Sequence, residues 1–279
     1  MPGSLQGSRV VPLARAAQGA PRYSLSFTAA GLRPDLAAVI AGIYAEQGDW
    51  SRTKAAVLER NALQARSASS GKRLESELRQ RLQYLSPAQL QLLAQGTSDE
   101  RCAMAWLAVL KRIQIAADLT SGVLLAKLSS LDPVLRRSDM AAFYEDCERD
   151  HPELAALAPS SQQKVRSALL QMIRDAGLLA GKAGKGGTLG TVQRPLLSPL
   201  VQELVARDDP ALLPGFLLHA PAKLAKSQRP AASAQTSSRP AAKPAVKSTA
   251  KPTAATKAAA KPKSKPAAKK AAPAQRTKP

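Results

Sequence analysis

The chain has 279 residues, 44% of them hydrophobic, so it is long enough for one large or two small domains with a buried core. Its net charge of +21 is uneven: from Ala222 to the C-terminus there are 15 Lys and Arg and no Asp or Glu, which leaves 26 basic and all 20 acidic residues, about +6, for the rest. Two cysteines exclude a disulfide framework, and no run of about 18 apolar residues is present to span a membrane, so we expect a protein of the reducing cytoplasm.

Both ends of the chain have compositions that predict disorder. Residues 1–21 lack an apolar segment of signal-peptide length, and we interpret them as a disordered leader. Residues 221–279 repeat Lys, Ala and Pro, with Leu224 and Val246 as their only large aliphatic side chains. This basic tail resembles those of linker-histone-like proteins, which neutralise DNA phosphates without sequence preference. A solubilising tail that touches anionic surfaces only weakly is the alternative.

Residues 22–132 predict a helical N-terminal domain. A first amphipathic helix ends before Gly48, and a second starts near Trp50 with Ser51 as its cap. The apolar residues of the first helix at helical spacing are Leu36, Val39, Ile40, Ile43 and Tyr44. Trp50, with its large apolar area, is expected to anchor the core rather than to stack on bases.

A third helix is predicted to be capped by Ser70, and its apolar stripe consists of Leu74, Leu78, Leu82 and Leu85. Ser86 and Pro87 predict the start of a fourth helix that ends at Gly96.

Thr97 and Glu100 form a capping box before a helix that is apolar nearly all round from residue 102 to 110, which indicates a central, buried helix. An apolar segment over residues 119–131 closes this domain, with the boundary at Asp132 and Pro133.

Residues 133–220 predict a second domain. Ser138 is the expected cap of its first helix, Pro152 starts a short helix, and Ser160, with Gln163, is expected to cap a long amphipathic helix up to Gly177. The segments LLAG and TLGTV are two short strands joined by a loop rich in Gly and Lys, and VQELVA is a further helix. The order of helix, short helix, amphipathic helix and β-hairpin is typical of a winged helix-turn-helix.

The outer face of the amphipathic helix predicts contact with DNA, because amide and guanidinium groups can bind base edges and phosphates. The candidates on this helix are Gln162, Gln163, Lys164, Arg166, Ser167 and Arg174, and those in the hairpin loop are Lys182 and Lys185. An ordinary solvated helix, or a winged helix that docks a protein, is the alternative interpretation.

Little in the sequence supports catalysis. The glycine-rich stretch GKAGKGGT is not a P-loop, because it follows a helix and does not end in Gly-Lys-Ser/Thr. Cys147 and His151 have a spacing that could bind a metal, but two ligands are a weak signal and a structural role is favoured. We therefore expect no catalytic residue, no metal and no cofactor.

Several segments together resemble the BrxA family of BREX (bacteriophage exclusion) defence systems, whose members were once labelled inner-membrane proteins. They are YSLSFTAAGL, the DW pair at residues 49–50, NALQARSASSGKRLESELRQRLQYL and SSQQKVRSALLQMIRDAGLL. The resemblance covers about residues 22–220. It implies an all-α body similar to the transcription antitermination factor NusB, with helix-turn-helix elements, binding of double-stranded DNA, and a role in phage restriction and host DNA methylation.

The start of the third helix is a second candidate DNA contact, because free amides and the helix dipole attract phosphate there. Its candidate residues are Ser70, Lys72, Arg73 and Arg79. Arg73 and Arg81 are spaced to pair with Glu77 instead, which would leave Lys72 and Arg79 free. A solvated face is the equal alternative.

These observations predict a mainly helical, non-enzymatic DNA-binding subunit that acts with other BREX components, the methyltransferase and ATPase subunits. An RNA-binding factor similar to NusB is one alternative, since the resemblance extends to that protein. A protein-docking adaptor whose only nucleic-acid contact is the basic tail is another. A linker-histone-like compaction protein is disfavoured, because the body is much larger than one winged helix and only mildly basic.

Overall fold

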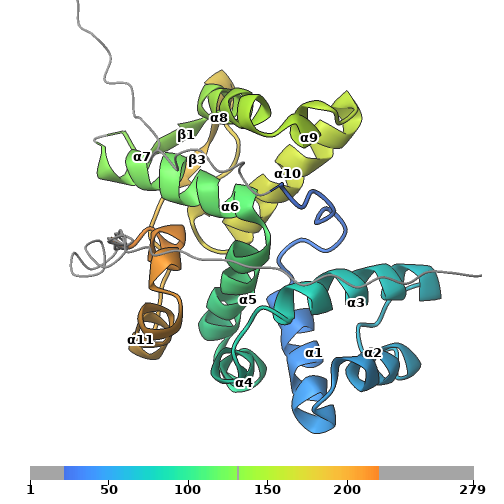
Figure 1. The fold of residues 1–279 in the computed structure, drawn as a ribbon. Coiled ribbons are helices and arrows are strands. Elements are labelled where there is room, and N and C mark those ends of the chain that lie inside the picture. Colours follow the sequence, from blue (N-terminus) through green and yellow to red (C-terminus); the bar gives the residue numbers. More distant parts are fainter. Residues whose placement is uncertain (1–21, 131, 220–279) are drawn as a thin grey trace, which may run out of the picture. The chain divides into compact units, whose positions relative to one another are not determined.

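The computed structural model describes residues 22–130 and 132–219, and these described residues belong to one compact unit (Figure 1). The fold is mainly helical with one small sheet, as predicted. The predictions for the leader and for the basic tail lie outside the described residues. The division into two domains at residue 132 stays a prediction.

Helix α1 (Pro34–Gln47) ends before Gly48, which is its C-cap, as predicted. Its buried face differs from the expected one: Val39 is 39% exposed, whereas Ala37 and Ala41 are buried. The small alanines allow neighbouring helices to approach α1 closely, so the face is chosen by packing rather than by side-chain size.

Helices α2 (Trp50–Glu59) and α3 (Ala68–Leu82) both start one or more residues before the predicted caps. Asp49, not Ser51, caps α2 by accepting from the Arg52 amide. Ser67, not Ser70, caps α3, and its side chain accepts from the Ser70 amide at 3.2 Å. In a run of serines and alanines, any serine could be the cap, and the preceding turn selects the first.

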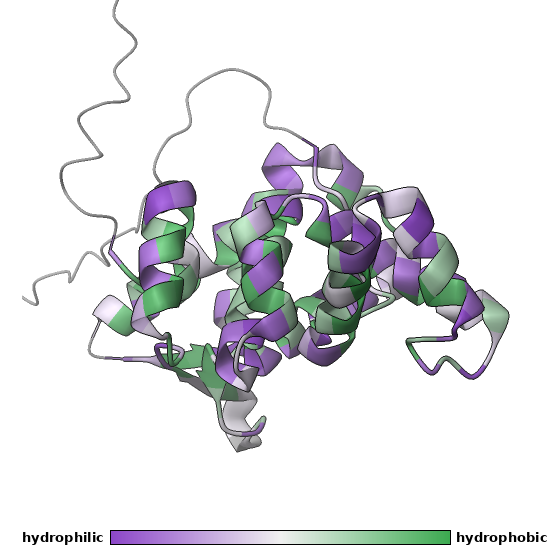
Figure 2. Ribbon diagram, turned by 90° about the horizontal axis from the view of Figure 1, so that it is seen from below, coloured by the Kyte–Doolittle hydropathy of each residue, from purple (hydrophilic) through white to green (hydrophobic). Residues whose placement is uncertain are grey.

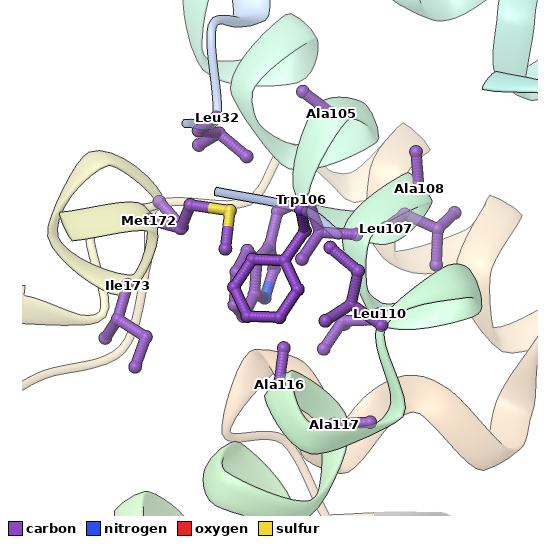
Figure 3. Close-up of a cluster of buried hydrophobic side chains, with 14 of the residues drawn as sticks. Leu32, Ala105, Trp106, Leu107, Ala108, Leu110, Ala116, Ala117, Met172 and Ile173 are labelled. Atoms are coloured by element: carbon purple, nitrogen blue, oxygen red, sulfur yellow. The ribbon is translucent and has the colours of Figure 1, made fainter. Parts of the chain in front are cut away.

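The caps of the next two helices agree with the predictions. Ser86 forms a capping box with Gln89 at the start of α4 (Pro87–Gln95), and Thr97 forms one with Glu100 at the start of α5 (Ser98–Arg112). Every residue of α5 from 103 to 110 is buried, which confirms the central helix. Trp106 lies in the middle of this core (Figure 3).

The C-terminal end of the described chain closes on α5. The Trp106 indole donates to the carbonyl of Gly215 at 3.0 Å. A Cβ added at Gly215 would lie only 2.5 Å from Leu110, so the close approach of the two segments requires glycine. Gly215 belongs to a 3₁₀ helix, Pro210–Phe216, which follows the predicted helix α11 (Pro199–Asp208), capped by Ser198.

Residues 114–136 lead from the central helix into the sheet. Helix α6 (Gln114–Asp118), a π-helical stretch (Leu119–Leu124) and α7 (Leu125–Ser129) follow one another and place Leu119 and Leu124 in the core. Strand β1 (Val134–Arg136) comes next and was not predicted. It is only three residues long, too short for an alternation to stand out.

The rest of the sheet comes from the predicted hairpin, β2 (Leu179–Ala180) and β3 (Thr188–Val192). The strand order is β1-β3-β2, with both pairs antiparallel. Between β1 and β2 the chain forms α8 (Arg137–Asp150), α9 (Pro152–Ala155) and α10 (Pro159–Asp175).

Two predicted caps in this part are wrong. Helix α8 starts at Arg137, with the Asp139 carboxylate accepting from the Arg136 amide at 2.7 Å, so Ser138 is not its cap. Helix α10 starts at Pro159 after Ala158, which has no side chain to cap it, so Ser160 lies inside the helix. Proline at the first helical position fixes the start of α10 without a cap, because it has no amide to satisfy.

The helices present hydrophobic residues inward and hydrophilic residues outward, and the strands are hydrophobic (Figure 2). Within residues 22–130 and 132–219, no helix combines the length and the apolar character that a membrane crossing needs.

Candidate nucleic-acid interface

Helix α10 has one buried face and one polar face. Val165, Leu169, Met172 and Ile173 are buried, which fixes the rotation of the helix about its axis. The opposite face exposes Gln163, Lys164, Ser167 and Gln171. Lys164 makes no ion pair with any described residue, so its charge is available to an anionic ligand.

Two of the predicted contacts on α10 are held by carbonyls of the protein. The Arg174 guanidinium donates to the Leu189 carbonyl of β3 at 2.6 Å, which fastens the end of α10 to the sheet. The Gln162 side chain donates to the Leu154 carbonyl of α9 at 3.4 Å. Both side chains are half-buried, so they hold α10 in position and are also partly accessible at its surface.

Arg166 occupies the border between α10 and α8. Its Nη2 lies 3.4 Å from a carboxylate oxygen of Glu148, and its guanidinium lies 4.6 Å from the centre of the Tyr144 ring.

Gln163 and Ser167, in contrast, bind only each other, at 3.4 Å. The helix therefore offers one free cation, Lys164, and one cation already paired, Arg166.

The loop between β2 and β3 lies next to α10 in the chain and carries an exposed Lys182. Gly186 and Gly187 adopt φ of 79° and 82°, a region that side chains with a Cβ avoid, so the loop needs its glycines to turn back into β3. The Gly184 amide donates to the Thr188 carbonyl at 3.0 Å and closes the turn. Of Lys185, only the backbone, within the 3₁₀ turn, is described.

The second predicted cluster, at the start of α3, is partly as expected. Ser70, Lys72 and Arg73 are exposed, and neither cation pairs with an acid among the described residues. The statement that Arg79 is free is wrong: its Nε lies 2.6 Å from the fully buried Glu75, one helical turn away.

Glu77 pairs with two arginines, and Arg73 is not one of them. Its carboxylate lies 3.0 Å from Arg81 and 2.8 Å from Arg112 of α5. Arg112 was not predicted as a partner, because it is distant in sequence and no local spacing points to it. Arg73 is exposed at the surface beside Lys72 in the sequence.

Three further exposed cations near this cluster were missed by the sequence reasoning. Arg52 and Lys54 lie on α2, Arg66 precedes α3, and none pairs with a described acid. Helices α2 and α3 pack together around a cavity of about 130 Å³ whose lining includes Lys72. The available signal was the lack of an acid three or four residues away from Lys54 in the sequence.

Cys147 and His151 belong to a packed cluster. The His151 ring stacks on Tyr23 at 3.6 Å, and its Nδ1 lies 3.2 Å from Glu153. The Tyr23 hydroxyl donates to Asp118 at 2.8 Å. In the part of the chain that the structure describes, no group of three or more His, Cys, Asp or Glu residues is placed to bind a metal ion.

Neither cysteine is activated as a nucleophile. Burial raises the pKa of Cys147 to about 11, and burial together with Asp175 raises the pKa of Cys102 to about 11. Because the thiolate is the reactive form, raised pKa values keep both thiols in the less reactive protonated form near neutral pH.

The described residues define a class of mainly helical proteins with a small antiparallel sheet and a polar, basic helix packed beside it. A crystal structure described as that of an uncharacterized protein from Magnetospirillum magneticum has the same fold, with a TM-score of 0.61 at 19% identity, covering 71% of this chain and 99% of the other. The model of the BrxA family matches residues 21–209. The chain belongs to the BrxA family, which confirms the resemblance found in the sequence.

Two relatives carry the name BREX protein BrxA. The one from Paramagnetospirillum magneticum (strain AMB-1) is 23% identical over 159 residues, which is 57% of this chain and 80% of the relative. The one from Escherichia coli O9:H4 (strain HS) is 26% identical over 139 residues, 50% of this chain and 65% of the relative. Family membership places the chain in BREX phage defence.

Proposed function

We propose that this protein is a non-enzymatic subunit of a BREX system that binds double-stranded DNA, chiefly through phosphate contacts, and supports restriction of phage and methylation of host DNA by partner subunits. The observation that carries the proposal is the outward face of α10. It exposes Gln163, Lys164, Ser167 and Gln171 in one row, with Lys182 in the adjoining loop.

The order of elements around α10 supports this proposal. Strand β1, helices α8, α9 and α10, and strands β2 and β3 follow in the order of a winged helix, in which the last helix enters the major groove and the β2–β3 loop touches the neighbouring backbone. Amides of Gln163 and Gln171 suit base edges, and Lys164 and Lys182 suit phosphates.

The basic cluster of α2 and α3 supplies a second surface of the same charge. Lys72 and Arg73 are free of acidic partners among the described residues, as are Arg52 and Lys54. A duplex that touched both surfaces would gain affinity steeply at low salt, since each neutralised phosphate releases counterions. The sequence adds 15 Lys and Arg beyond Ala222, which would strengthen binding by the same mechanism.

The decisive experiment compares the full chain with a chain that ends at Ala220, which retains all described residues. Binding to a labelled DNA duplex is measured by fluorescence anisotropy from about 50 to 200 mM salt, a range over which six to ten phosphate contacts change affinity by about 10³–10⁵-fold. We expect the shorter chain to bind, more weakly and with a shallower salt slope.

In the shorter chain, Lys164→Ala is expected to weaken binding about fivefold and to lower the salt slope by about one, because one phosphate contact is lost. The matched control is Arg207→Ala, which removes an exposed cation paired with Asp208 on α11, a helix that packs on α5. Equal effects of the two changes would mean that α10 is not the interface.

The alternatives give different outcomes in the same assay. Loss of all binding with the tail would make the body a protein-docking adaptor. Stronger competition by structured RNA than by duplex DNA would make the protein an RNA-binding factor. Helix α10 would then have to contact RNA in another way than by entering the major groove, because the deep groove of A-form RNA does not admit a helix.

A further inference from the structure

We propose that Glu148 of α8 is a built-in competitor for DNA phosphate at Arg166, so that Arg166 binds phosphate only by giving up this carboxylate. The inference rests on the proposed function and goes beyond it by identifying a residue that lowers affinity. It follows from three features of the Arg166 side chain: its contact with the Tyr144 ring, its buried Nε atom and its ion pair with Glu148.

Arg166 is held in place from below by Tyr144. The aromatic ring is buried, and its centre lies 4.6 Å from the guanidinium carbon, so the cation rests on a fixed surface. The Nε atom of Arg166 is buried with no hydrogen-bond partner among the described residues. That edge of the guanidinium faces the protein and is closed to a ligand.

The open side of the guanidinium is shared with Glu148. Nη2 lies 3.4 Å from the carboxylate, and the pair is half-exposed, with 38% of the Arg166 side chain and 28% of the Glu148 side chain accessible. A phosphate and a carboxylate are the same kind of ligand for a guanidinium, a planar or tetrahedral group of anionic oxygens. Because Nε is unavailable, both would have to use the terminal nitrogens.

A phosphate that reached Arg166 would therefore also meet the negative charge of Glu148. The carboxylate would lose its partner while a second anion came close, and both effects oppose binding. Removing the charge of Glu148 should leave Arg166 in position on Tyr144 and should raise affinity for DNA. An ordinary surface ion pair that only stabilises the fold would not have this effect.

The test is Glu148→Gln in the full chain, which keeps the side-chain shape and removes the charge. We expect DNA binding at about 100 mM salt to tighten about threefold, within the range that release of a partly exposed ion pair allows. The matched control is Glu145→Gln, one turn earlier on α8, where an exposed carboxylate makes no ion pair with a described residue. It alters the net charge equally and should change affinity much less.

A double-mutant cycle assigns the gain to Arg166. The tightening by Glu148→Gln should disappear in a chain that also carries Arg166→Ala, because the released cation is then missing. A gain of the same size in the two backgrounds, or equal effects of Glu148→Gln and Glu145→Gln, would overturn the inference. Urea unfolding of each variant shows whether the fold is intact.

Failure of the inference differs from failure of the proposed function. If Lys164→Ala leaves binding of the full chain unchanged, the α10 surface does not bind DNA and the proposed function fails. If Lys164→Ala weakens binding but Glu148→Gln does not strengthen it, the surface binds DNA and Glu148 is not a competitor.

Discussion

Arg81 illustrates how much one buried side chain can hold together. It is 2% exposed, pairs with Glu77, and donates to the carbonyls of Phe27 and Gly31 and to the sulfur of Met172. Burial lowers the pKa of its guanidinium, and the carboxylate of Glu77 opposes that change. The sequence spacing predicted the Glu77 pair, but not that it would be internal.

Replacement of Arg81 is accordingly expected to be costly. Arg81→Ala should lower the free energy of unfolding by about 3–5 kcal/mol, because it leaves two carbonyls without donors and a buried acid with one cation fewer. Arg73→Ala, which removes an exposed arginine from the same helix, should change stability by less than about 0.5 kcal/mol. Urea unfolding followed by circular dichroism measures both, and equal losses would contradict a buried network.

At the scale of the elements, helix ends with a defined motif were predictable and those in repetitive sequence were not. Ser86-Pro87 and the Thr97–Glu100 box are unambiguous, and both are confirmed. The serines and alanines around the start of α3, and the serines in the first turn of α10, offer several equivalent starts. In these two helices the preceding turn or a proline determines the first helical residue, and neither leaves a local sequence pattern that selects one serine as the cap.

The correction at α3 can be checked directly. Ser67→Ala should lower the free energy of unfolding by about 1 kcal/mol, because the Ser70 amide loses its acceptor. Ser70→Ala should cost only a few tenths of a kcal/mol, since alanine suits a helix interior and only the hydroxyl contact with Ser67, 2.9 Å, is lost. The reverse ranking in thermal or urea unfolding would restore Ser70 as the cap.

At the scale of the whole molecule, the helical class, the central helix and the β-hairpin were predictable from periodicity. Strand β1 and the pairing of Glu77 with Arg112 were not, because each depends on segments distant in sequence. The candidate site shows the same division. The polar face of α10 is visible in its 3.6-residue period, whereas the roles of Arg166 and Arg174 depend on α8 and β3.

The closure of the C-terminal segment on α5 is a long-range contact of this kind. Gly215→Ala should lower the free energy of unfolding by about 1–3 kcal/mol, because its Cβ would lie 2.5 Å from Leu110 in the packed core around Trp106. Gly122→Ala, where a Cβ meets nothing within 4 Å, should be neutral or stabilising. A harmless Gly215→Ala would mean that this segment is not packed against α5.

The contacts of Arg81 also set the relation between the two basic surfaces. One guanidinium on α3 contacts the carbonyls of Phe27 and Gly31 and the sulfur of Met172 of α10. Because α3 and α10 share this buried contact, we expect the spacing of the two basic surfaces to be set by the fold rather than by the ligand. A duplex that touches both would have to match that spacing or bend to it, and the ease of bending, rather than any single base contact, would then favour some sequences over others.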